Sequence, residues 1–197
     1  PLNPENFTSG SGKKVWWKCP KGEDHEWKAQ IASRSSGTGC PFCAGRKVSN
    51  TNSFVVKFPQ IADEWHPNKN GDLKPKEFTA GSTKLVWWRC AKDSVHEWEA
   101  RIADRGHKKS VCPYCSGNRV SNTNSLAAKF PDIASEWQPT KNDDLKPGEF
   151  THGSNKKVWW QCKSEVCLVW NAAIKSRTRS SVSGCPFCAG KKVDNSQ

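Results

Sequence analysis

The dipeptide Trp-Trp occurs three times in the sequence, at residues 16–17, 87–88 and 159–160, so that the copies are offset by 71 and 72 residues. The surrounding residues repeat as well, because the 18 residues that end two positions after each pair align without a gap. Self-similarity at a fixed period indicates a tandem array in which each copy forms one small structural unit. We therefore expect three related modules rather than one large core.

All ten cysteines fall within this repeat, and in the first two copies a histidine joins them. The candidate metal ligands are Cys19, His25, Cys40 and Cys43 in the first copy, Cys90, His96, Cys112 and Cys115 in the second, and Cys162, Cys167, Cys185 and Cys188 in the third. Three cysteines with one histidine, or four cysteines, are the sets that structural zinc prefers. The sequence thus predicts three structural Zn²⁺ ions, with Cys167 replacing the histidine in the third copy.

Other uses of the cysteines are less consistent with the pattern. Cys112-Pro-Tyr-Cys115 has the form of a glutaredoxin-like redox motif, but the strand-to-helix context of that fold is missing and every copy supplies two further ligands. A disulfide scaffold suits secreted chains and leaves the histidines unexplained, while histidine ligation favours zinc over rubredoxin-like iron. Four protein ligands leave no position for a reactive water, and no nucleophile with a matched base recurs, so we do not expect an enzyme.

The composition is unusual for a folded protein. Leu, Ile, Val and Phe make up about 16% of the chain, and the formal net charge is +12, values typical of disordered chains. The eleven tryptophans argue against disorder, and metal-centred cores reinforced by tryptophan explain both observations. No segment approaches the roughly 18 apolar residues of a membrane-spanning helix, so no membrane association is expected.

The segments between copies are predicted to be helical linkers. Phe54, Phe58, Ile61 and Trp65 are spaced as on one helix face, Asn52 or Ser53 can cap its start, and Pro59 either kinks the helix or opens a second one. Leu126, Phe130, Ile133 and Trp137 repeat the spacing. In a strand Trp16 and Trp17 face opposite sides, so one member of each pair fills the core and the other meets the linker or solvent. Trp27 and Trp65 are assigned to packing, and His66 to the surface or a helix end.

The predicted fold is a small metal-stabilised α+β class: three tandem zinc-ribbon or treble-clef-like modules, each a β-hairpin with a zinc knuckle, joined by short helical linkers. The expected domains are a first module at residues 1–52, a linker helix with the second module at 53–124, and a linker helix with the third at 125–197. Both ends of the chain fall inside the repeat, which favours a part of a longer array or a larger protein.

The motif series Trp-Trp-x-Cys, His-x-Trp and Cys-Pro-x-Cys-x-Gly, together with the linker Glu-Trp-x-Pro-x-Lys-Asn, resembles the family of tandem treble-clef or zinc-ribbon-like repeats over essentially the whole chain. The resemblance puts Cys19, Cys90 and Cys162 at the first ligand position and the Cys-Pro-x-Cys pairs at the last two. It implies modules that attach to nucleic acid, some of them beside endonuclease domains, although many members have no assigned function.

Basic residues recur before Trp-Trp, after the hairpin and after the knuckle, which suits a polymer with repeating phosphates. The candidate contacts are Lys13, Lys14, Lys18, Arg34, Arg46, Lys47, Lys84, Arg89, Arg105, His107, Lys108, Lys109, Arg119, Lys156, Arg177, Arg179, Lys191 and Lys192. We predict sequence-selective binding of duplex DNA through the variable basic loops before each Cys-Pro-x-Cys. Binding of RNA or single strands, and a scaffold for acidic or chromatin partners, remain alternatives.

Ten reduced thiols require a reducing intracellular compartment. We expect the nucleus, with an organelle or a bacterial or viral cytoplasm as alternatives, and a monomeric state for this fragment.

Overall fold

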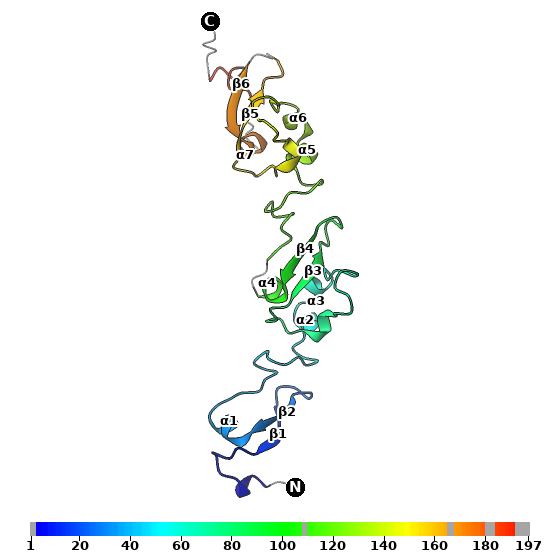
Figure 1. Cartoon of the computed structure of the whole chain (residues 1–197), viewed down its shortest axis with the longest axis vertical. Helices are drawn as coiled ribbons and strands as arrows, with labels where there is room; N and C mark the ends of the chain where they lie inside the picture. The colour runs from blue at the N-terminus through cyan, green and yellow to red at the C-terminus, as the bar shows by residue number, and fades with distance from the viewer. Residues whose placement is uncertain (1–2, 108–109, 165–167, 180–183, 192–197) are drawn as a thin grey trace. The chain divides into compact units, whose positions relative to one another are not determined.

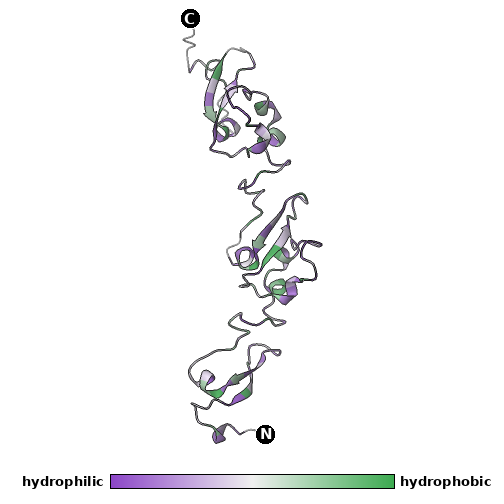
Figure 2. Ribbon diagram, viewed as in Figure 1, coloured by the Kyte–Doolittle hydropathy of each residue, from purple (hydrophilic) through white to green (hydrophobic). Residues whose placement is uncertain are grey.

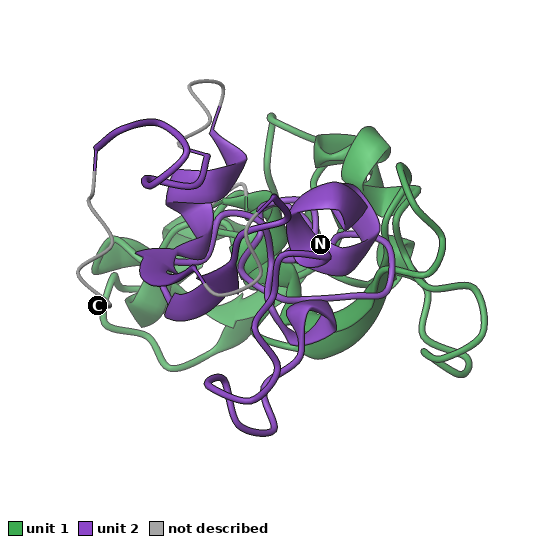
Figure 3. Ribbon diagram, turned by 90° about the horizontal axis from the view of Figure 1, so that it is seen from above, with its two compact units in different colours: residues 1–110 green, residues 111–197 purple. Residues whose placement is uncertain are grey.

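The computed structural model describes residues 3–107, 110–164, 168–179 and 184–191 (Figure 1). It contains two compact units, Pro1–Ser110 and Val111–Gln197, which Figure 3 shows in different colours. Unit 1 contains the hairpins of the first two copies, and unit 2 contains the hairpin of the third. In the described part of the chain no helix is long and apolar enough to cross a membrane.

Each copy has an antiparallel two-stranded hairpin that runs directly into a short helix (Figure 1). The three sets are β1 (Lys14–Lys18), β2 (Glu26–Gln30) and α1 (Ile31–Ser35); β3 (Leu85–Arg89), β4 (Glu97–Arg101) and α4 (Ile102–Gly106); and β5 (Lys157–Gln161), β6 (Val169–Ala173) and α7 (Ile174–Thr178). A 3-10 turn precedes each hairpin, at η1 (Pro4–Asn6), η2 (Pro75–Glu77) and η3 (Pro147–Glu149). The register is the same in all three, with Trp17, Trp88 and Trp160 opposite Trp27, Trp98 and Trp170.

Each linker forms two short helices rather than one. They are α2 (Phe54–Lys57) and α3 (Pro59–Ala62) in the first linker, and α5 (Leu126–Lys129) and α6 (Pro131–Ala134) in the second. Phe58, at φ −140° and ψ 62°, leaves the helical region, and Pro59 begins the next turn. Because proline lacks an N–H and fixes φ, it is favoured in the first turn of a helix and not inside one. Of the two roles that the sequence left open for Pro59, the structure selects the start of a second helix.

The core of each linked copy forms where the linker packs on the hairpin that follows it. Trp88 is fully buried, and its ring lies 5.7 Å from that of Phe54 and 5.5 Å from that of Trp65. Trp65 in turn stacks on Phe78 at 5.9 Å. The same arrangement joins Trp137 to Trp160 and Phe150, and Figure 2 shows hydrophobic positions in the hairpins and linker helices alternating with polar ones. The predicted packing roles of Trp27 and Trp65 are confirmed, since Trp27 is buried and Trp65 packs against Trp88 and Phe78.

The two members of each Trp-Trp pair face opposite sides, as predicted. In the second and third copies the second member fills the core, since Trp88 and Trp160 are fully buried, whereas Trp17 of the first copy is half-buried. The first member faces outward: Lys69 lies 4.4 Å over the ring of Trp87, and Lys141 lies 4.6 Å over that of Trp159. Trp16 is 72% exposed.

The sequence placed His66 at the surface or at a helix end. The residue lies shortly after the linker helix α3 and is buried, so the surface alternative is wrong. Its Nδ1 accepts hydrogen bonds from the backbone N–H groups of Asn68 and Lys69, so the ring caps the turn after the linker helix. Nε2 lies 2.8 Å from Oε1 of Glu97 on β4. Lys69, and then His66, hold the pKa of the Glu97 carboxyl below its usual value because both donate hydrogen bonds to it.

Candidate metal centre

The first metal group assembles at one end of the first hairpin. Cys19 directly follows β1 and His25 directly precedes β2, and the N–H of Cys19 donates to the carbonyl of His25 at 3.0 Å, which extends the ladder to the two ligands. Cys40 and Cys43 lie on a turn after α1, closed by the hydrogen bond from Ala44 N–H to the Cys40 carbonyl. Gly45 ends this turn with a φ of 69°, a value that residues with a Cβ rarely adopt.

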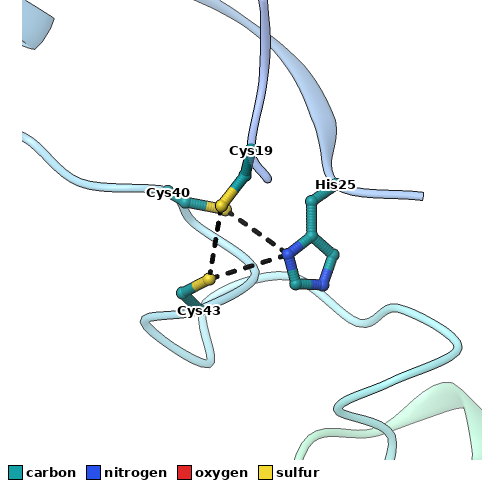
Figure 4. Close-up of side chains that lie close together, drawn as sticks. All are labelled: Cys19, His25, Cys40 and Cys43. Atoms are coloured by element: carbon teal, nitrogen blue, oxygen red, sulfur yellow. Dashed lines mark hydrogen bonds between the residues drawn. The ribbon is translucent and has the colours of Figure 1, made fainter. Parts of the chain in front are cut away.

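The distances within this group fit a zinc ion. The sulfurs of Cys19 and Cys43 are 3.7 Å apart, and Nδ1 of His25 lies 3.6 Å from the sulfur of Cys43 and 3.8 Å from that of Cys40 (Figure 4). A tetrahedral site with Zn–S bonds of about 2.3 Å has sulfur–sulfur edges of about 3.8 Å. The donor set and its spacing therefore fit structural zinc, for which three thiolates and one imidazole are a preferred combination.

The other ring nitrogen of His25 is held by hydroxyl groups that sequence reasoning missed. Nε2 lies 3.0 Å from Oγ of Ser49 and 2.9 Å from Oγ1 of Thr51, and the buried ring stacks on Phe42 at 5.0 Å. Such outer contacts fix the tautomer and orientation of a ligating histidine. The signal was present in the sequence, because Val-Ser-Asn-Thr-Asn follows the knuckle in the first two copies, from Val48 and Val120.

The remaining ligand sets also assemble. Cys90, His96, Cys112 and Cys115 form the second group, and Cys162, Cys185 and Cys188 form the third; in each group the ligand atoms lie within 4.8 Å of one another. In the third, the sulfurs of Cys162 and Cys188 are 3.4 Å apart. The predicted fourth ligand of this group, Cys167, lies outside the described residues. Three Cys/His clusters thus fit three structural zinc sites.

When no metal is bound, the pKa values of the packed thiols shift in different directions. Desolvation of the Cys40 thiol is outweighed by backbone hydrogen bonds at Cys43 and Phe42, which lower its pKa, whereas the pKa values of Cys43 and Cys188 are raised. Hydrogen bonds with Cys162 and Cys185 raise the pKa of Cys188 to about 11. Desolvation, together with hydrogen bonds with Cys19 and Cys40, raises the pKa of Cys43 to about 11. Zinc binds the thiolate, so its entry must displace these protons.

Two of the predicted nucleic-acid contacts are instead part of the core. Arg105 is 4% exposed and Arg177 is 2% exposed. The guanidinium of Arg105 lies between the rings of Trp88 and Trp98, each at 5.3 Å, and forms an ion pair with Glu64. Arg177 lies between Trp160 and Trp170 and pairs with Glu136 at 2.6 Å. The expectation that these two arginines contact nucleic acid is therefore corrected.

Arg34 occupies the equivalent position in the first copy and is half-buried. It lies 5.2 Å from the ring of Trp17 and 5.5 Å from that of Trp27, and its guanidinium donates to the carbonyl of Thr38. A basic residue next to a variable loop looks like a phosphate contact in a sequence. The structure instead shows Arg34 stacked on Trp17 and Trp27, which precede it in the chain and are brought together only by the hairpin.

Most of the other predicted contacts lie on the surface. Those described and exposed are Lys13, Lys14, Lys18, Arg46, Lys47, Lys84, Arg89, His107, Arg119, Lys156, Arg179 and Lys191. Lys18 forms an exposed ion pair with Glu26, and the ring of His107 packs edge-on against that of Phe58. Lys108, Lys109 and Lys192 lie outside the described residues.

Comparison with known proteins agrees with this geometry. A family model described as a probable treble clef zinc finger domain matches residues 1–46, 61–118 and 133–191, which together span more than half of the chain. No curated protein matches the chain.

Proposed function

The chain belongs to the treble clef zinc finger family, and from that premise we propose that it binds nucleic acid, with duplex DNA as the preferred target. The observation that supports this most directly is a set of exposed cations that recurs at equivalent positions of each copy. Lys13, Lys84 and Lys156 precede the three hairpins, and all are exposed. None of them has an ion-pair partner among the described residues.

Several acidic side chains are held in ion pairs away from these recurring cations. Glu64 and Glu136 are engaged with the buried arginines, and Glu97 is engaged with Lys69 and His66. Much of the positive charge therefore remains on surface lysines and arginines, where a phosphate backbone can reach it. Arg46 with Lys47, Arg119, and Lys191 add exposed cations after the knuckles.

Selection of a DNA sequence belongs to the loops that precede the Cys-Pro pairs, because these differ between copies in length and residues. With Arg105 and Arg177 committed to the core, the exposed candidates described in these loops are His107 and Arg179. Base contacts by such side chains would add specificity to a register that the phosphate contacts set.

The test is a titration of the zinc-loaded chain with labelled duplex DNA, single-stranded DNA and RNA of one sequence at several salt concentrations. We expect the tightest binding to the duplex, with a log-log salt slope of about −0.9 per phosphate contact. Preference for a single strand or RNA would replace the duplex assignment. Absence of binding to all three at low salt would refute the proposal.

Two variants with equal charge distinguish a specific face from general attraction. Lys84→Ala with Lys156→Ala removes the recurring cations ahead of the hairpins, whereas Lys57→Ala with Lys129→Ala removes exposed lysines at the ends of α2 and α5. The first pair should weaken binding and reduce the salt slope by about 2, while the second should have little effect. Equal losses would show that net charge alone drives association.

A further inference from the structure

The inner face of the first hairpin is open, although the same face is buried in the other two copies. Val86, Trp88 and Ile102 are at most 2% exposed, whereas their counterparts Val15, Trp17 and Ile31 are partly exposed. A groove of about 410 Å³ lies over this face, lined by Pro4, Phe7, Val15, Trp16, Trp17 and Ile31.

In the second and third copies a linker covers this face. Trp65 fills the space between Trp88 and Phe78, with ring centroids 5.5 Å and 5.9 Å away, and Trp137 does the same in the third copy. The counterparts of Trp88 and Phe78 in the first copy, Trp17 and Phe7, both line the open groove.

The linker also binds the outer edge of the hairpin by backbone hydrogen bonds. The N–H of Arg89 donates to the Glu64 carbonyl at 2.7 Å, and the N–H of His66 donates to the Trp87 carbonyl at 3.0 Å. The Asn70 side chain brackets Trp87, accepting from its N–H at 2.8 Å and donating to its carbonyl at 2.9 Å. Asn142 brackets Trp159 in the same way.

The equivalent edge of β1 has no such partner. Antiparallel pairs alternate between hydrogen-bonded and non-hydrogen-bonded positions, and Trp16 opposite Lys28 has the register of Trp87 opposite Glu99. The N–H and carbonyl of Trp16 therefore point away from β2. In the part of the chain that the structure describes, neither they nor the Lys18 N–H has a hydrogen-bond partner on that side. An exposed strand edge of this kind is a template for an added segment.

Within the described ranges, the arginine on this face also lacks the carboxylate partner that its counterparts have. Arg105 and Arg177 each pair with a linker glutamate, Glu64 or Glu136, next to the tryptophan that enters the core. Arg34 has the same stacking on two indoles, but among the described residues its guanidinium has no carboxylate partner and donates only to a carbonyl. A carboxylate that arrives with a docking segment would complete the pair.

We propose that the first hairpin is a docking site for a segment of the linker type, with the pattern Phe or Leu-x₃-Phe-Pro-x-Ile-x₂-Glu-Trp-x₄-Asn that residues 54–70 and 126–142 share. The apolar residues of the segment fill the groove, with its tryptophan between Phe7 and Trp17. Its backbone and its asparagine bind the edge of β1, and its glutamate pairs with Arg34. Of the cations proposed to contact nucleic acid, Lys13 adjoins the groove, since its Nζ lies 4.9 Å from the centre of the Phe7 ring, whereas Lys84 and Lys156 belong to the other two copies. Peptide binding is measured without nucleic acid, so either assignment can fail without the other.

The experiment is a titration of the zinc-loaded full chain into a labelled synthetic peptide of residues 52–73, followed by anisotropy. We expect saturable binding of one peptide per chain and slower hydrogen exchange at the amides of Trp16 and Lys18. Peptides with Trp65→Ala or Glu64→Gln should bind at least about tenfold more weakly, since each removes a central anchor. A peptide with Val56→Ser should bind as the parent, because Val56 is 54% exposed when the linker is docked.

Three results of this titration would overturn the proposal. The first is the absence of saturable binding, and the second is equal affinity for the parent and Trp65→Ala peptides. The third is protection at β3 or β5 rather than at β1, which would mean that the peptide replaces a resident linker. Sedimentation of the chain alone tests whether a second copy of the chain occupies the face instead. Self-association that protects the β1 amides, and that added peptide does not reverse, would assign the face to a second copy and overturn the proposal.

Discussion

Arg105 and Arg177 show how a charged residue becomes a core residue in this chain. Each guanidinium lies between two indole rings and forms an ion pair with a glutamate from the linker. Cation–π contacts contribute about 2 kcal/mol when desolvated, and the planar guanidinium is suited to stacking in a way that an ammonium is not. The arginine thus joins the linker, the two strands and the short helix that follows them.

We predict that Arg105→Ala lowers the free energy of unfolding by about 3 kcal/mol, because it removes the stacked cation and leaves Glu64 without its partner. Urea unfolding followed by tryptophan fluorescence measures the change. The control is Arg101→Ala, an exposed residue at the end of β4, which should alter stability by less than about 0.5 kcal/mol. Parent-like stability of Arg105→Ala would contradict the core role and return this arginine to the candidate DNA contacts.

At the scale of elements, the repeat unit consists of a linker and the hairpin that follows it. The interface combines ring packing around Trp88 or Trp160 with hydrogen bonds from Asn70 or Asn142 to the strand edge. The aromatic contacts supply most of the buried apolar area, and the asparagine fixes the register of the linker on the strand.

We predict that Asn142→Ala loosens the linker on β5 without loss of zinc. Two hydrogen bonds to the backbone of Trp159, both 2.8 Å long, disappear. At about 1 kcal/mol each, their loss should speed hydrogen exchange at the Trp159 amide by at least about tenfold. Asn171→Ala, on the exposed side of β6, should leave this exchange rate unchanged. Unchanged exchange in Asn142→Ala would show that ring packing alone sets the register.

Local patterns in the sequence were sufficient to predict the hairpins, the knuckles and those metal ligands that lie in the described part of the chain. The spacing of Cys19, His25, Cys40 and Cys43 identified one complete site, because ligands of a given metal must be of fixed types and lie close together. The sequence could not decide which of Trp16 and Trp17 faces the core. Alternation along a strand defines two faces but does not say which one a linker will cover. Arg105 was misplaced, and the burial of His66 was missed, because their partners lie far away in the chain.

At the scale of the whole molecule, metal ions replace the large apolar core that this composition cannot supply. Each zinc would hold the end of a hairpin against its knuckle, where among the described residues of the first copy only one large apolar side chain, Phe42, also packs between them, against His25 and Trp27. Folding of such modules is expected to be coupled to metal binding, as it is in small zinc domains generally.

We predict that the chain binds three zinc ions and that chelation unfolds the modules. Native mass spectrometry should find three ions at neutral pH, and fewer than two would refute the ligand assignment. Because Cys43 and Cys188 have pKa values raised to about 11 without metal, these thiols are protonated below that pH and zinc must displace the protons. The apparent affinity should therefore fall as pH falls, by up to about tenfold per pH unit for each displaced proton. An affinity that does not change between neutral and mildly acidic pH would contradict this ligand chemistry.

The hydroxyl groups of Ser49 and Thr51, which hold the outer nitrogen of His25, belong to the same stretch of chain that starts the next linker at Ser53. A further hydrogen bond, 3.0 Å long, runs from Thr79 of the following copy to the carbonyl of Gly45 in the knuckle. Neighbouring copies are therefore energetically coupled, as in a one-dimensional lattice model. Folding of one copy stabilises the folded state of the next. Damage to one metal centre is expected to spread as fraying along the array.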